Sequence, residues 1–415
     1  MSDRGWSFPP PTASDLEDRE VPLVGRHLVG RRIALLVTGG IAAFKAPLVA
    51  RALRKRGADV VAFASQEALR YVTEEALERS TVHPVVTRLT AAAEHLSDAA
   101  PFDAYLVAPA TYNTINKLRY GIADSVVSAS LASALGRLGQ GRTRVLLAPT
   151  MHGTLHTPIL TESLAFLAGL GVDVVRPRDD YGKHNLPGEE ELVAAVCRAV
   201  STSRLKGRPI LVTGGPTPVP IDSVRRITNV FTGALGAAIA EELHLRGAEV
   251  EWIHGESTCP PPAHIPHSVI RTYDEYRARV HEALASRSHW AAIFSAGVAD
   301  YRPAEVRAGK TPSGGALSRL EMVPLPKVID EVRDAFPDLF MVTFKYQEGI
   351  SHEELMAIAR ERLSRFPVVL ANRGEDQGPN GEQVAYLVSV GADPQRAVGK
   401  PEIARAIADH LERSG

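Results

Sequence analysis

The sequence predicts an α/β protein made of two consecutive doubly wound parallel-sheet domains, and three observations support this prediction. A pattern of apolar strand, glycine turn, helix and strand occupies residues 31–65. The same pattern starts again at residues 209–255. Between them, residues 200–209 ("VSTSRLKGRP") are polar and irregular, as expected of a linker. Continuous apolar strands that alternate with helices are typical of parallel sheets covered on both faces.

The first expected domain covers residues 23–203. Residues 33–37 ("IALLV") form a continuous apolar run, and further strand candidates follow at 102–110, 143–149 and 169–177. The helix expected after the first strand has apolar residues at helical spacing and reaches Gly57, a residue type that often ends helices. Residues 1–22 are polar, rich in proline and without an apolar signal core, so we expect a flexible tail.

The second expected domain covers residues 204–415. Its first strand, glycine turn, long loop and helix lie within residues 209–255. Residues 289–303 and 338–349 indicate two more strands that end in polar loops, and 367–372 ("PVVLAN") indicate a last buried strand. Residues 401–415 have the spacing of a closing helix.

Composition narrows the class of protein. The 415 residues carry a formal net charge of −1 and no long basic run, so nucleic acid is not favoured as a partner. The two cysteines, Cys197 and Cys259, lie far apart, which argues against a disulfide framework and favours a reducing cytoplasm. No apolar run is long enough to span a membrane. We therefore expect a cytoplasmic protein that acts on small molecules.

Polar residues follow the strands of the first domain. Residues 38–44 ("TGGIAAF") join a strand to a helix, where glycine lets the backbone approach a ligand and a helix N-terminus attracts anions. A tight structural turn is the alternative, and Thr111, Asn113 or Thr114 could simply cap the next helix. In doubly wound sheets the carboxyl ends of the strands form the ligand site. A phosphorylated ligand is therefore expected at Gly39, Gly40, Ser65, Thr111 and Asn113.

Three segments of this domain, "VTGGIAAFKA", "APATYNTINKLRYGIAD" and "PTMHGTLHTPIL", resemble the flavin-dependent cysteine decarboxylases. The resemblance covers most of residues 30–175 and is best with phosphopantothenoylcysteine decarboxylases. It implies FMN, held by the five residues named above, and a trimer with FMN near subunit interfaces. It also implies that His95 is the catalytic base, because the family places a histidine shortly before the "APAT" strand. A histidine of ordinary pKa can take a proton from a substrate near neutral pH.

Two positions differ from that family. His152 stands where the family has an asparagine that binds the substrate carboxylate, so the resemblance makes His152 a substrate-contacting candidate. Metal binding by His152 with His156 and a purely structural role are the alternatives. The family's substrate-covering loop carries a redox cysteine, whereas "RDDYGKHNLPGEEEL" at residues 178–192 contains none. The flavin half could therefore complete the decarboxylation, stop at an oxidised product or act on another acid.

The second domain has its own candidate site. Gly214 and Gly215 end a strand, and Thr232 and Gly233 open a helix whose backbone amides can hold phosphate. Asn229 precedes that helix, and a solvated turn is the alternative for this residue. Asp300 ends a later strand, and Lys310 follows ten residues on as a mobile positive charge.

Residues 208–376 resemble phosphopantothenate–cysteine ligases, because "GGPTPVPIDSVRRITNVFTGALG" keeps the order and nearly the spacing of that family's motif. The resemblance implies an acyl nucleotidylate held by Asn229, phosphate charge stabilised by Lys310, and Asp300 in contact with nucleotide or Mg²⁺. The segments "GKTPSGGALSRLEMVPLPKVID" and "TFKYQEG" resemble the eukaryotic-type ligases. They add nucleotide-site candidates and leave CTP and ATP both open; these candidates are Ser313, Gly314, Gly315, Lys327 and Lys345.

The order of the two domains is that of the bifunctional enzymes of coenzyme A biosynthesis. The resemblance implies nucleotide-dependent ligation of 4'-phosphopantothenate to cysteine, followed by FMN-dependent decarboxylation towards 4'-phosphopantetheine. Two alternatives stay open: a paralogue that joins another acid to an amine and has changed flavin chemistry, and a non-catalytic flavin- or nucleotide-binding regulatory subunit. A homo-oligomer is expected, with trimers of the flavin domain and dimers of the ligase domain.

Overall fold

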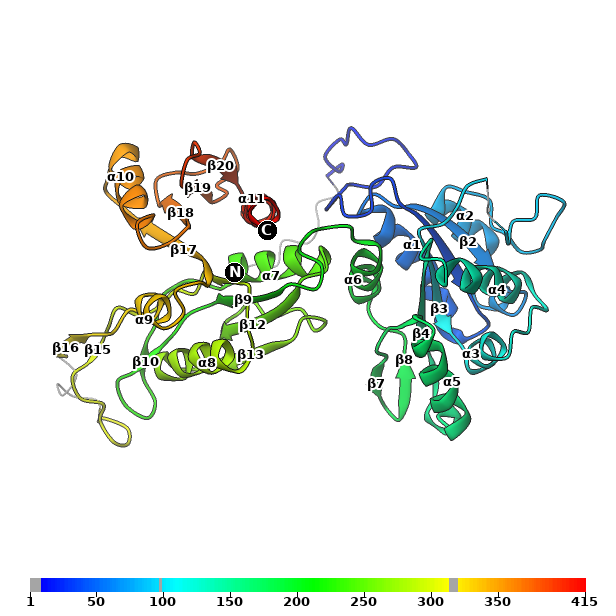
Figure 1. Ribbon diagram of the computed structural model, residues 1–415, viewed down its shortest axis with the longest axis horizontal. Coiled ribbons are helices and arrows are strands. Elements are labelled where there is room, and N and C mark those ends of the chain that lie inside the picture. Colours follow the sequence, from blue (N-terminus) through cyan, green and yellow to red (C-terminus); the bar gives the residue numbers. More distant parts are fainter. Residues whose placement is uncertain (1–8, 97–98, 313–319) are drawn as a thin grey trace. The chain divides into compact units, whose positions relative to one another are not determined.

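The computed structural model describes residues 9–96, 99–312 and 320–415 (Figure 1). The chain divides into two compact units, Met1–Val200 and Ser201–Gly415. Each unit is a parallel or mostly parallel sheet with helices on both faces, which confirms the predicted α/β class. In the described parts, no helix combines the length and apolar character that crossing a bilayer requires.

The sheet of the first unit has five strands in the order β2-β1-β3-β4-β6, all parallel. Its register is set by apolar runs; Ile33 of β1, for example, lies opposite Val60 of β2 and Ala104 of β3. The strands are β1 (Arg32–Val37), β2 (Asp59–Ala64), β3 (Ala104–Ala110), β4 (Arg144–Pro149) and β6 (Asp173–Val174). The last is shorter than the expected strand at 169–177.

Helices cover both faces of this sheet. Helices α3 (Tyr112–Arg119), α4 (Val126–Leu138) and α5 (Pro158–Gly169) pack against alternate strand residues such as Leu36 and Val107. The opposite face carries α1 (Ala46–Arg54) and α6 (Glu189–Val200), and α2 (Glu74–Thr81) packs against α1. Helix α1 ends three residues before Gly57, whose backbone is left-handed with φ +94°.

Short elements surround the carboxyl edge of the sheet. A three-stranded antiparallel sheet, in the order β5-β8-β7, is formed by β5 (Met151–His152), β7 (Arg178–Asp180) and β8 (Lys183–Asn185). Three short 3-10 helices complete the unit: η1 (Ile41–Lys45), η2 (Ala68–Arg70) and η3 (Gly153–Leu155). These elements bring residues from distant parts of the sequence to one end of the main sheet.

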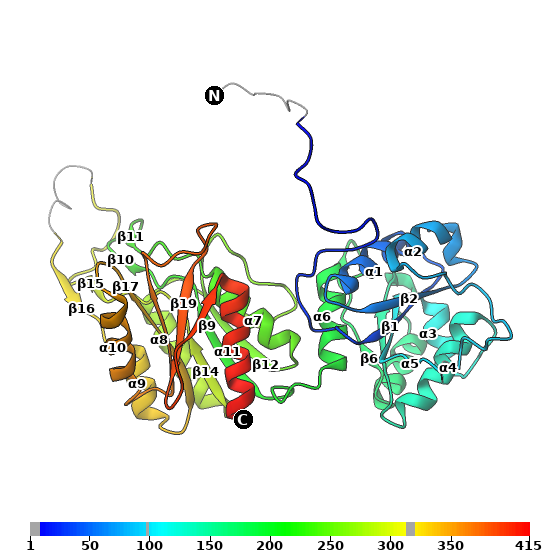
Figure 2. The same ribbon diagram turned by 90° about the horizontal axis from the view of Figure 1, so that it is seen from above.

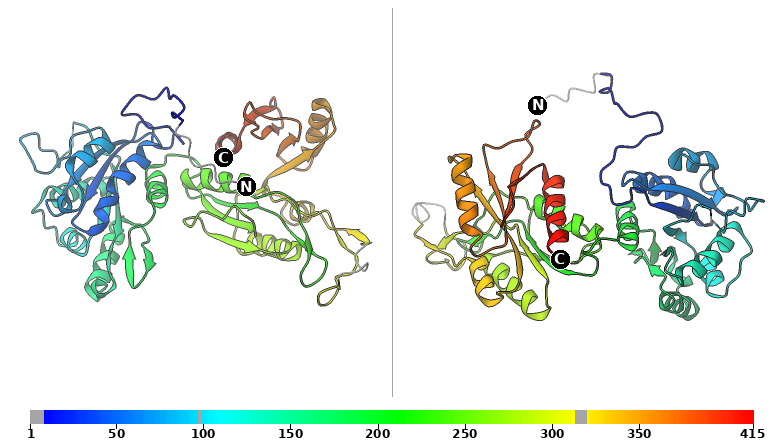
Figure 3. Two further views of the ribbon diagram at one scale, coloured as in Figure 1. Left: turned by 180° about the vertical axis from the view of Figure 1, so that it is seen from behind. Right: turned by 45° about the horizontal axis from the view of Figure 1, so that its top comes forward.

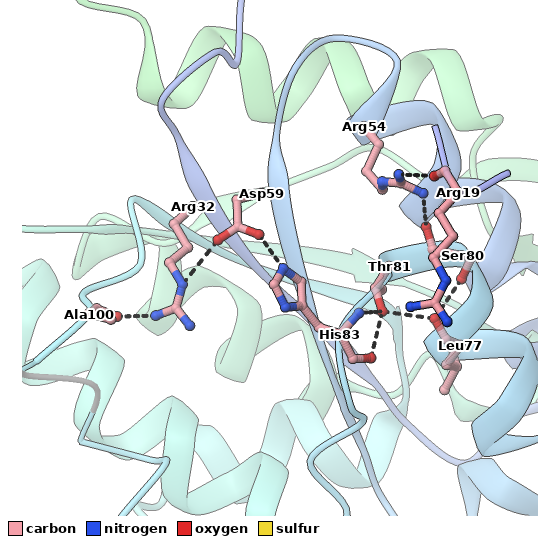
Figure 4. A network of polar contacts seen from close by, with 9 residues as sticks. All are labelled: Arg19, Arg32, Arg54, Asp59, Leu77, Ser80, Thr81, His83 and Ala100. Atoms are coloured by element: carbon pink, nitrogen blue, oxygen red, sulfur yellow. Dashed lines mark hydrogen bonds and ion pairs between the residues drawn. The ribbon is translucent and has the colours of Figure 1, made fainter. Parts of the chain in front are cut away.

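Polar side chains contact one another at the amino ends of the strands of the first sheet. Asp59, which begins β2, lies between Arg32 and His83, at 3.3 Å from Arg32 Nε and 2.5 Å from His83 Nε2 (Figure 4). Arg54 donates to the carbonyl of Arg19 at 2.6 Å. Residues 9–22, expected as a tail, contain no helix or strand, yet this contact ties part of them to α1.

The second unit has an eight-stranded sheet in the order β13-β12-β9-β14-β17-β18-β19-β20 (Figure 2). The pairs from β13 to β18 are parallel, and β19 and β20 continue the sheet in antiparallel pairs. The strands are β9 (Pro209–Gly214), β12 (Glu249–Gly255), β13 (His267–Ile270), β14 (Ala291–Phe294), β17 (Phe340–Gln347), β18 (Val368–Arg373), β19 (Val384–Ser389) and β20 (Gln395–Val398).

Its helices again form two layers. Helices α7 (Ala234–Leu245) and α11 (Lys400–Ser414) lie side by side on one face, over a core that includes Val212 and Trp252 (Figures 2 and 3). The other face packs against α8 (Tyr273–Ser286), α9 (Val328–Ala335) and, over β18, α10 (His352–Arg362). Two small hairpins extend from the sheet: β10 (Val219–Pro220) with β11 (Arg226–Ile227), and β15 (Tyr301–Pro303) with β16 (Met322–Pro324).

Candidate active sites

The first candidate site is a cavity at the point where the strand order of the first sheet reverses. From β1, the chain runs to β2 on one side and then returns to β3 on the other. The loops after these strands diverge there and leave a crevice, which is where doubly wound sheets bind ligands. The cavity has a volume of about 760 Å³.

The cavity gathers five predicted phosphate contacts and one predicted substrate contact. They come from four loops, which follow β1, β2, β3 and β4; the six residues are Gly39, Gly40, Ser65, Thr111, Asn113 and His152. Apolar side chains, including Ile41 and Leu155, complete the wall. A concave, partly apolar cavity with few convergent polar groups is typical of a small-molecule site.

Local geometry explains the glycine and threonine at this edge. A Cβ on Gly39 would lie 2.3 Å from Cβ of Glu67, so only glycine allows the β1 and β2 loops to approach this closely. Thr111 is the N-cap of α3, and its hydroxyl accepts from the backbone N–H of Thr114 at 3.4 Å. Of the three residues that could cap this helix, Thr111 does so while also lining the cavity.

His152 ends β5 and has a defined hydrogen-bond arrangement. Its Nδ1 accepts from the backbone N–H of Thr154 at 3.2 Å and lies 2.9 Å from the Thr154 hydroxyl. Because Nδ1 is an acceptor in this arrangement, the neutral ring carries its proton on Nε2. His152 and His156 do not lie on one α-helix, since they are the N-cap and the C-cap of the short 3-10 helix η3. Among the described residues, no three His, Cys, Asp or Glu side chains are grouped to hold a metal ion.

A hydrogen-bonded chain joins the β7–β8 hairpin to α5. Asp179 Oδ1 lies 2.5 Å from His184 Nδ1, and His184 Nε2 lies 2.7 Å from His156 Nδ1. His156 Nε2 in turn lies 3.2 Å from the Thr161 hydroxyl of α5. His184 lines the cavity, so this chain fixes one of the cavity walls.

His95 lies apart from these residues. It occupies a turn between β2 and β3, is half-buried, and is not one of the residues that line the cavity. Its Nδ1 is buried and has no hydrogen-bond partner among the described atoms. The structure therefore does not bring His95 to the cavity that His152 lines.

The second candidate site lies at the corresponding reversal of the second sheet. From β9, the chain runs to β12 on one side and returns to β14 on the other. Gly215 follows β9 with φ +75°, and a Cβ there would lie 2.8 Å from the carbonyl oxygen of Gly255. Gly233, the left-handed N-cap of α7, packs against Gly215 so closely that a Cβ would lie 2.8 Å from its nitrogen. The turn after Gly214 and the start of α7 after Thr232 thus form one compact backbone surface.

Asn229 is tied to the loop after β14. Its Nδ2 donates to the carbonyl of Gly297 at 2.9 Å and lies 3.4 Å from the carbonyl of Val298. Phe231 packs on the same glycine, because a Cβ on Gly297 would lie 2.8 Å from its ring. This arrangement leaves the side-chain oxygen of the exposed Asn229 as its acceptor for a ligand.

The loop that carries Lys310 is anchored by Asp222. This carboxylate accepts from the backbone N–H of Thr311 at 3.1 Å, of Val224 at 2.9 Å and of Arg225 at 2.8 Å. Arg225 closes the link by donating to Asp222 at 2.7 Å and to the carbonyl of Thr311 at 3.0 Å. The backbone N–H donors, with Val224 first, hold the pKa of Asp222 well below its usual range. Lys310 itself is exposed on this anchored loop.

Three charged candidates meet beside the β14 and β17 ends. Asp300 forms an ion pair with Lys327. Burial lowers the pKa of Lys345, and the positive charges of Arg362 and Lys327 lower it further, against the opposing effect of Asp300. An anionic ligand would relieve this repulsion, because opposite charge favours the protonated lysine. Ser313, Gly314 and Gly315 lie outside the described residues.

Several lining and anchoring residues were not predicted from the sequence. The hairpin residues Lys183, His184 and Asn185 line the cavity, although their strands are three residues long and have no apolar alternation. Asp222 and Arg225 are part of the "PIDSVRR" segment, but their partner Thr311 is 86 or more residues away. The signal that the sequence offered was an acidic and a basic residue three positions apart, Asp222 and Arg225, within the ligase-like motif.

Comparisons with known proteins agree with this division of the chain. The Flavoprotein family matches residues 23–201, and the DNA/pantothenate metabolism flavoprotein C-terminal domain matches residues 205–414. The coenzyme A biosynthesis bifunctional protein CoaBC of Thermococcus kodakarensis is 35% identical over 396 residues, which cover 94% of this chain and 96% of that protein. CoaBC of Methanocaldococcus jannaschii is 28% identical, covering 83% of this chain and 84% of that protein.

Among solved structures, the DNA/pantothenate metabolism flavoprotein of Streptococcus pneumoniae is similar to half of the chain. It is 26% identical with a TM-score of 0.45, covering 50% of this chain and 100% of that structure. The relative from Thermococcus kodakarensis, in contrast, matches along nearly the full length of both proteins, across both units. The chain therefore belongs to the family of bifunctional coenzyme A biosynthesis proteins.

Proposed function

We propose that the chain joins 4'-phosphopantothenate to cysteine in its second unit and decarboxylates the product to 4'-phosphopantetheine in its first. Membership of the family makes it a ligase and a flavin-dependent decarboxylase. The observation that carries the finer proposal is the position of the candidates. Six flavin-site candidates line one cavity at the reversal of the first sheet, and the glycine turn and the start of α7 meet at the reversal of the second; the six are Gly39, Gly40, Ser65, Thr111, Asn113 and His152.

The ligase half requires a carboxylate to attack the α-phosphate of a nucleoside triphosphate. Pyrophosphate then leaves, and the cysteine amine attacks the acyl nucleotidylate to form the amide. The backbone surface of Gly215 and Gly233 offers N–H groups to phosphate at the start of α7. Lys310 and Lys345 would balance phosphate charge, which is greatest in the transition state. Asn229 would hold the acyl nucleotidylate by accepting, through its side-chain oxygen, a hydrogen bond from a hydroxyl or N–H group of that intermediate.

Magnesium and the identity of the nucleotide also belong to this proposal. A triphosphate normally enters such a site with Mg²⁺, and Asp300 is the carboxylate beside the cationic cluster. Lys327 already pairs with Asp300, so binding of nucleotide and metal would rearrange that pair. Both CTP and ATP are compatible with the residues described.

The cavity of the first unit suits FMN. Its volume of about 760 Å³ lies within the usual range for cofactor sites, about 300–1,000 Å³. Backbone at Gly39 and Gly40, with the hydroxyls of Ser65 and Thr111 and the amide of Asn113, would hold the flavin and its phosphate. When bound, flavin would accept the two electrons of thiol oxidation, which makes loss of carbon dioxide from the adjacent carbon easy, and would return them with protons to the resulting enethiol to give 4'-phosphopantetheine.

Protein side chains would supply the remaining chemistry of that half. His152 would orient the substrate carboxylate through its Nε2–H, because Nδ1 is occupied by Thr154. His95 would take the proton of the substrate as a general base. Since His95 does not line the cavity of its own subunit, we place it at the cavity of a neighbouring subunit in a trimer.

Separate assays of the two half-reactions test this proposal. With 4'-phosphopantothenate, cysteine, Mg²⁺ and either nucleotide, the protein should release one pyrophosphate for each amide formed. With N-(4'-phosphopantothenoyl)cysteine and FMN, it should release one carbon dioxide for each 4'-phosphopantetheine. Pyrophosphate release without carbon dioxide release would favour the paralogue with changed flavin chemistry. Binding of flavin and nucleotide with neither reaction would favour the regulatory subunit.

A further inference from the structure

The β7–β8 hairpin presents a cation beside His152 at the cavity. We infer that Lys183 is a specificity-determining residue, which binds the carboxylate of the substrate together with His152. This inference rests on the proposed function, which requires a carboxylated substrate in the first unit. Lys183 belongs to the β7–β8 hairpin, which lines the cavity, whereas His152 belongs to β5.

Strand pairing fixes the relation of the two residues. β5 and β8 are antiparallel, and His152 lies directly opposite Lys183. Side chains of opposed residues leave the same face of a sheet, with Cβ atoms about 5 Å apart. Both residues line the cavity. The strand register therefore places both side chains on one face of the small sheet, at the wall of the cavity.

The chemistry of the two side chains is complementary. His152 has its Nδ1 occupied by Thr154 and offers one neutral N–H donor. It therefore gives direction to a carboxylate but no charge. Lys183 adds the charge, and a charge-assisted hydrogen bond is about twice as strong as a neutral one. Asp180 lies opposite Lys183 in the register of β7 and β8, but it is not one of the residues that line the cavity.

The histidine chain keeps Lys183 in place. His184 follows Lys183 in β8, and its two ring nitrogens are engaged by Asp179 and by His156. Strand alternation directs the side chains of His184 and Lys183 to opposite faces of the hairpin, although both residues border the cavity. His184 thus fastens the hairpin to the segment before α5 while Lys183 stays free for a ligand. In this account His184 and His156 are positioning residues, not catalytic ones.

Binding of two unreactive analogues tests the inference. The serine analogue of N-(4'-phosphopantothenoyl)cysteine keeps the carboxylate and lacks the thiol, and the corresponding ethanolamine amide lacks both. Calorimetric titration of the FMN-loaded protein gives the ratio of the two affinities. Lys183→Gln should lower this ratio about tenfold, the effect of one charge-assisted hydrogen bond, with affinity for the amide unchanged. The matched control is Arg178→Gln, an exposed cation of the same hairpin that does not line the cavity.

The outcomes are distinct. An unchanged ratio in Lys183→Gln would overturn the inference and leave the proposed function standing. An equal loss of affinity for both analogues would also overturn it, since Lys183 would then contact the phosphate or the flavin. If the wild-type protein binds neither analogue, the proposed substrate itself is wrong and the inference falls with it. His184→Phe should lower the same ratio and raise hydrogen exchange at residues 176–186, whereas unchanged values of both would remove the positioning role.

Discussion

Thr154 donates its backbone N–H to Nδ1 of His152 at 3.2 Å. The same nitrogen lies 2.9 Å from the Thr154 hydroxyl. This contact sets the ring tautomer with hydrogen on Nε2. A histidine held in this way presents a neutral N–H donor, as the amide of an asparagine would. The replacement of asparagine by histidine in the "PTMH" turn can therefore preserve carboxylate binding.

Substitution of His152 tests this equivalence. His152→Asn should keep kcat/KM for decarboxylation within about threefold of the wild type, because a neutral N–H donor remains. His152→Ala should lower it about 30-fold, the cost of a lost hydrogen bond to a charged group. Carbon dioxide release gives both values, and amide formation in the second unit serves as the internal control. Full activity of His152→Ala would show that this side chain does not bind the carboxylate.

His95 is expected to act only in the flavin half. His95→Asn should remove thiol oxidation, because asparagine cannot take up the proton, while amide formation continues at the wild-type rate. Anaerobic reduction of bound flavin by N-(4'-phosphopantothenoyl)cysteine measures the oxidation step directly. Flavin content should stay at the wild-type level. An unchanged reduction rate would mean that another residue is the base.

Lys310 is expected to act only in the ligase half. Lys310→Ala should lower kcat for amide formation by at least about 100-fold. The reason is that the lysine charge stabilises the negative charge on the phosphates in the transition state. Flavin should remain bound. Lys400→Ala, which removes an exposed lysine at the start of α11, is the matched control and should retain full activity. Retained ligation in Lys310→Ala would refute the assignment of this site.

Asp222 should make the stability of the second unit depend on pH. Hydrogen bonds from backbone N–H groups, that of Val224 first, lower the pKa of Asp222. A carboxylate with a lowered pKa stabilises the folded state above its unfolded pKa of about 4, and this contribution is lost as the pH falls further. Asp222→Asn should therefore lower the Tm, and the decrease should be the same at every pH from about 5 to 7.

The difference in Tm between Asp222→Asn and the wild type should then shrink as the pH falls from about 4 to 3. Calorimetric scans across this range measure it, and Asp393→Asn, at an exposed carboxylate, provides the control. Ligation should weaken in Asp222→Asn, since the loop of Lys310 loses its anchor at Thr311. A Tm difference that does not change with pH would mean that Asp222 acts through shape alone.

The sequence predicted those features that local patterns specify. An apolar run followed by glycine and a helical pattern is typical of a buried parallel strand, a tight turn and a helix. This pattern predicts the turns at Gly39, Gly40, Gly214 and Gly215. Thr111 was recognised as either a cap or a ligand contact, and it caps α3 at the cavity wall.

Long-range contacts could not be predicted in this way. His184 meets His156 across 28 residues, and Thr311 meets Asp222 across 89. Neither contact leaves a periodic pattern, since each depends on how two irregular loops fold over a sheet edge. The short strands β7 and β8 consist of polar residues, and they are defined by backbone pairing, of β7 with β8 and of β8 with β5, rather than by burial. Cavity residues on such strands are therefore found only from the structure.

The most direct test of the account is mass spectrometry of one reaction mixture. The mixture contains the purified FMN-loaded protein, 4'-phosphopantothenate, cysteine, Mg²⁺, CTP and ATP. We predict that 4'-phosphopantetheine accumulates, with consumption of the nucleotide that the ligase half uses. Accumulation of N-(4'-phosphopantothenoyl)cysteine alone, or of an oxidised enethiol, would contradict the proposed decarboxylation. Absence of any new amide would contradict the account as a whole.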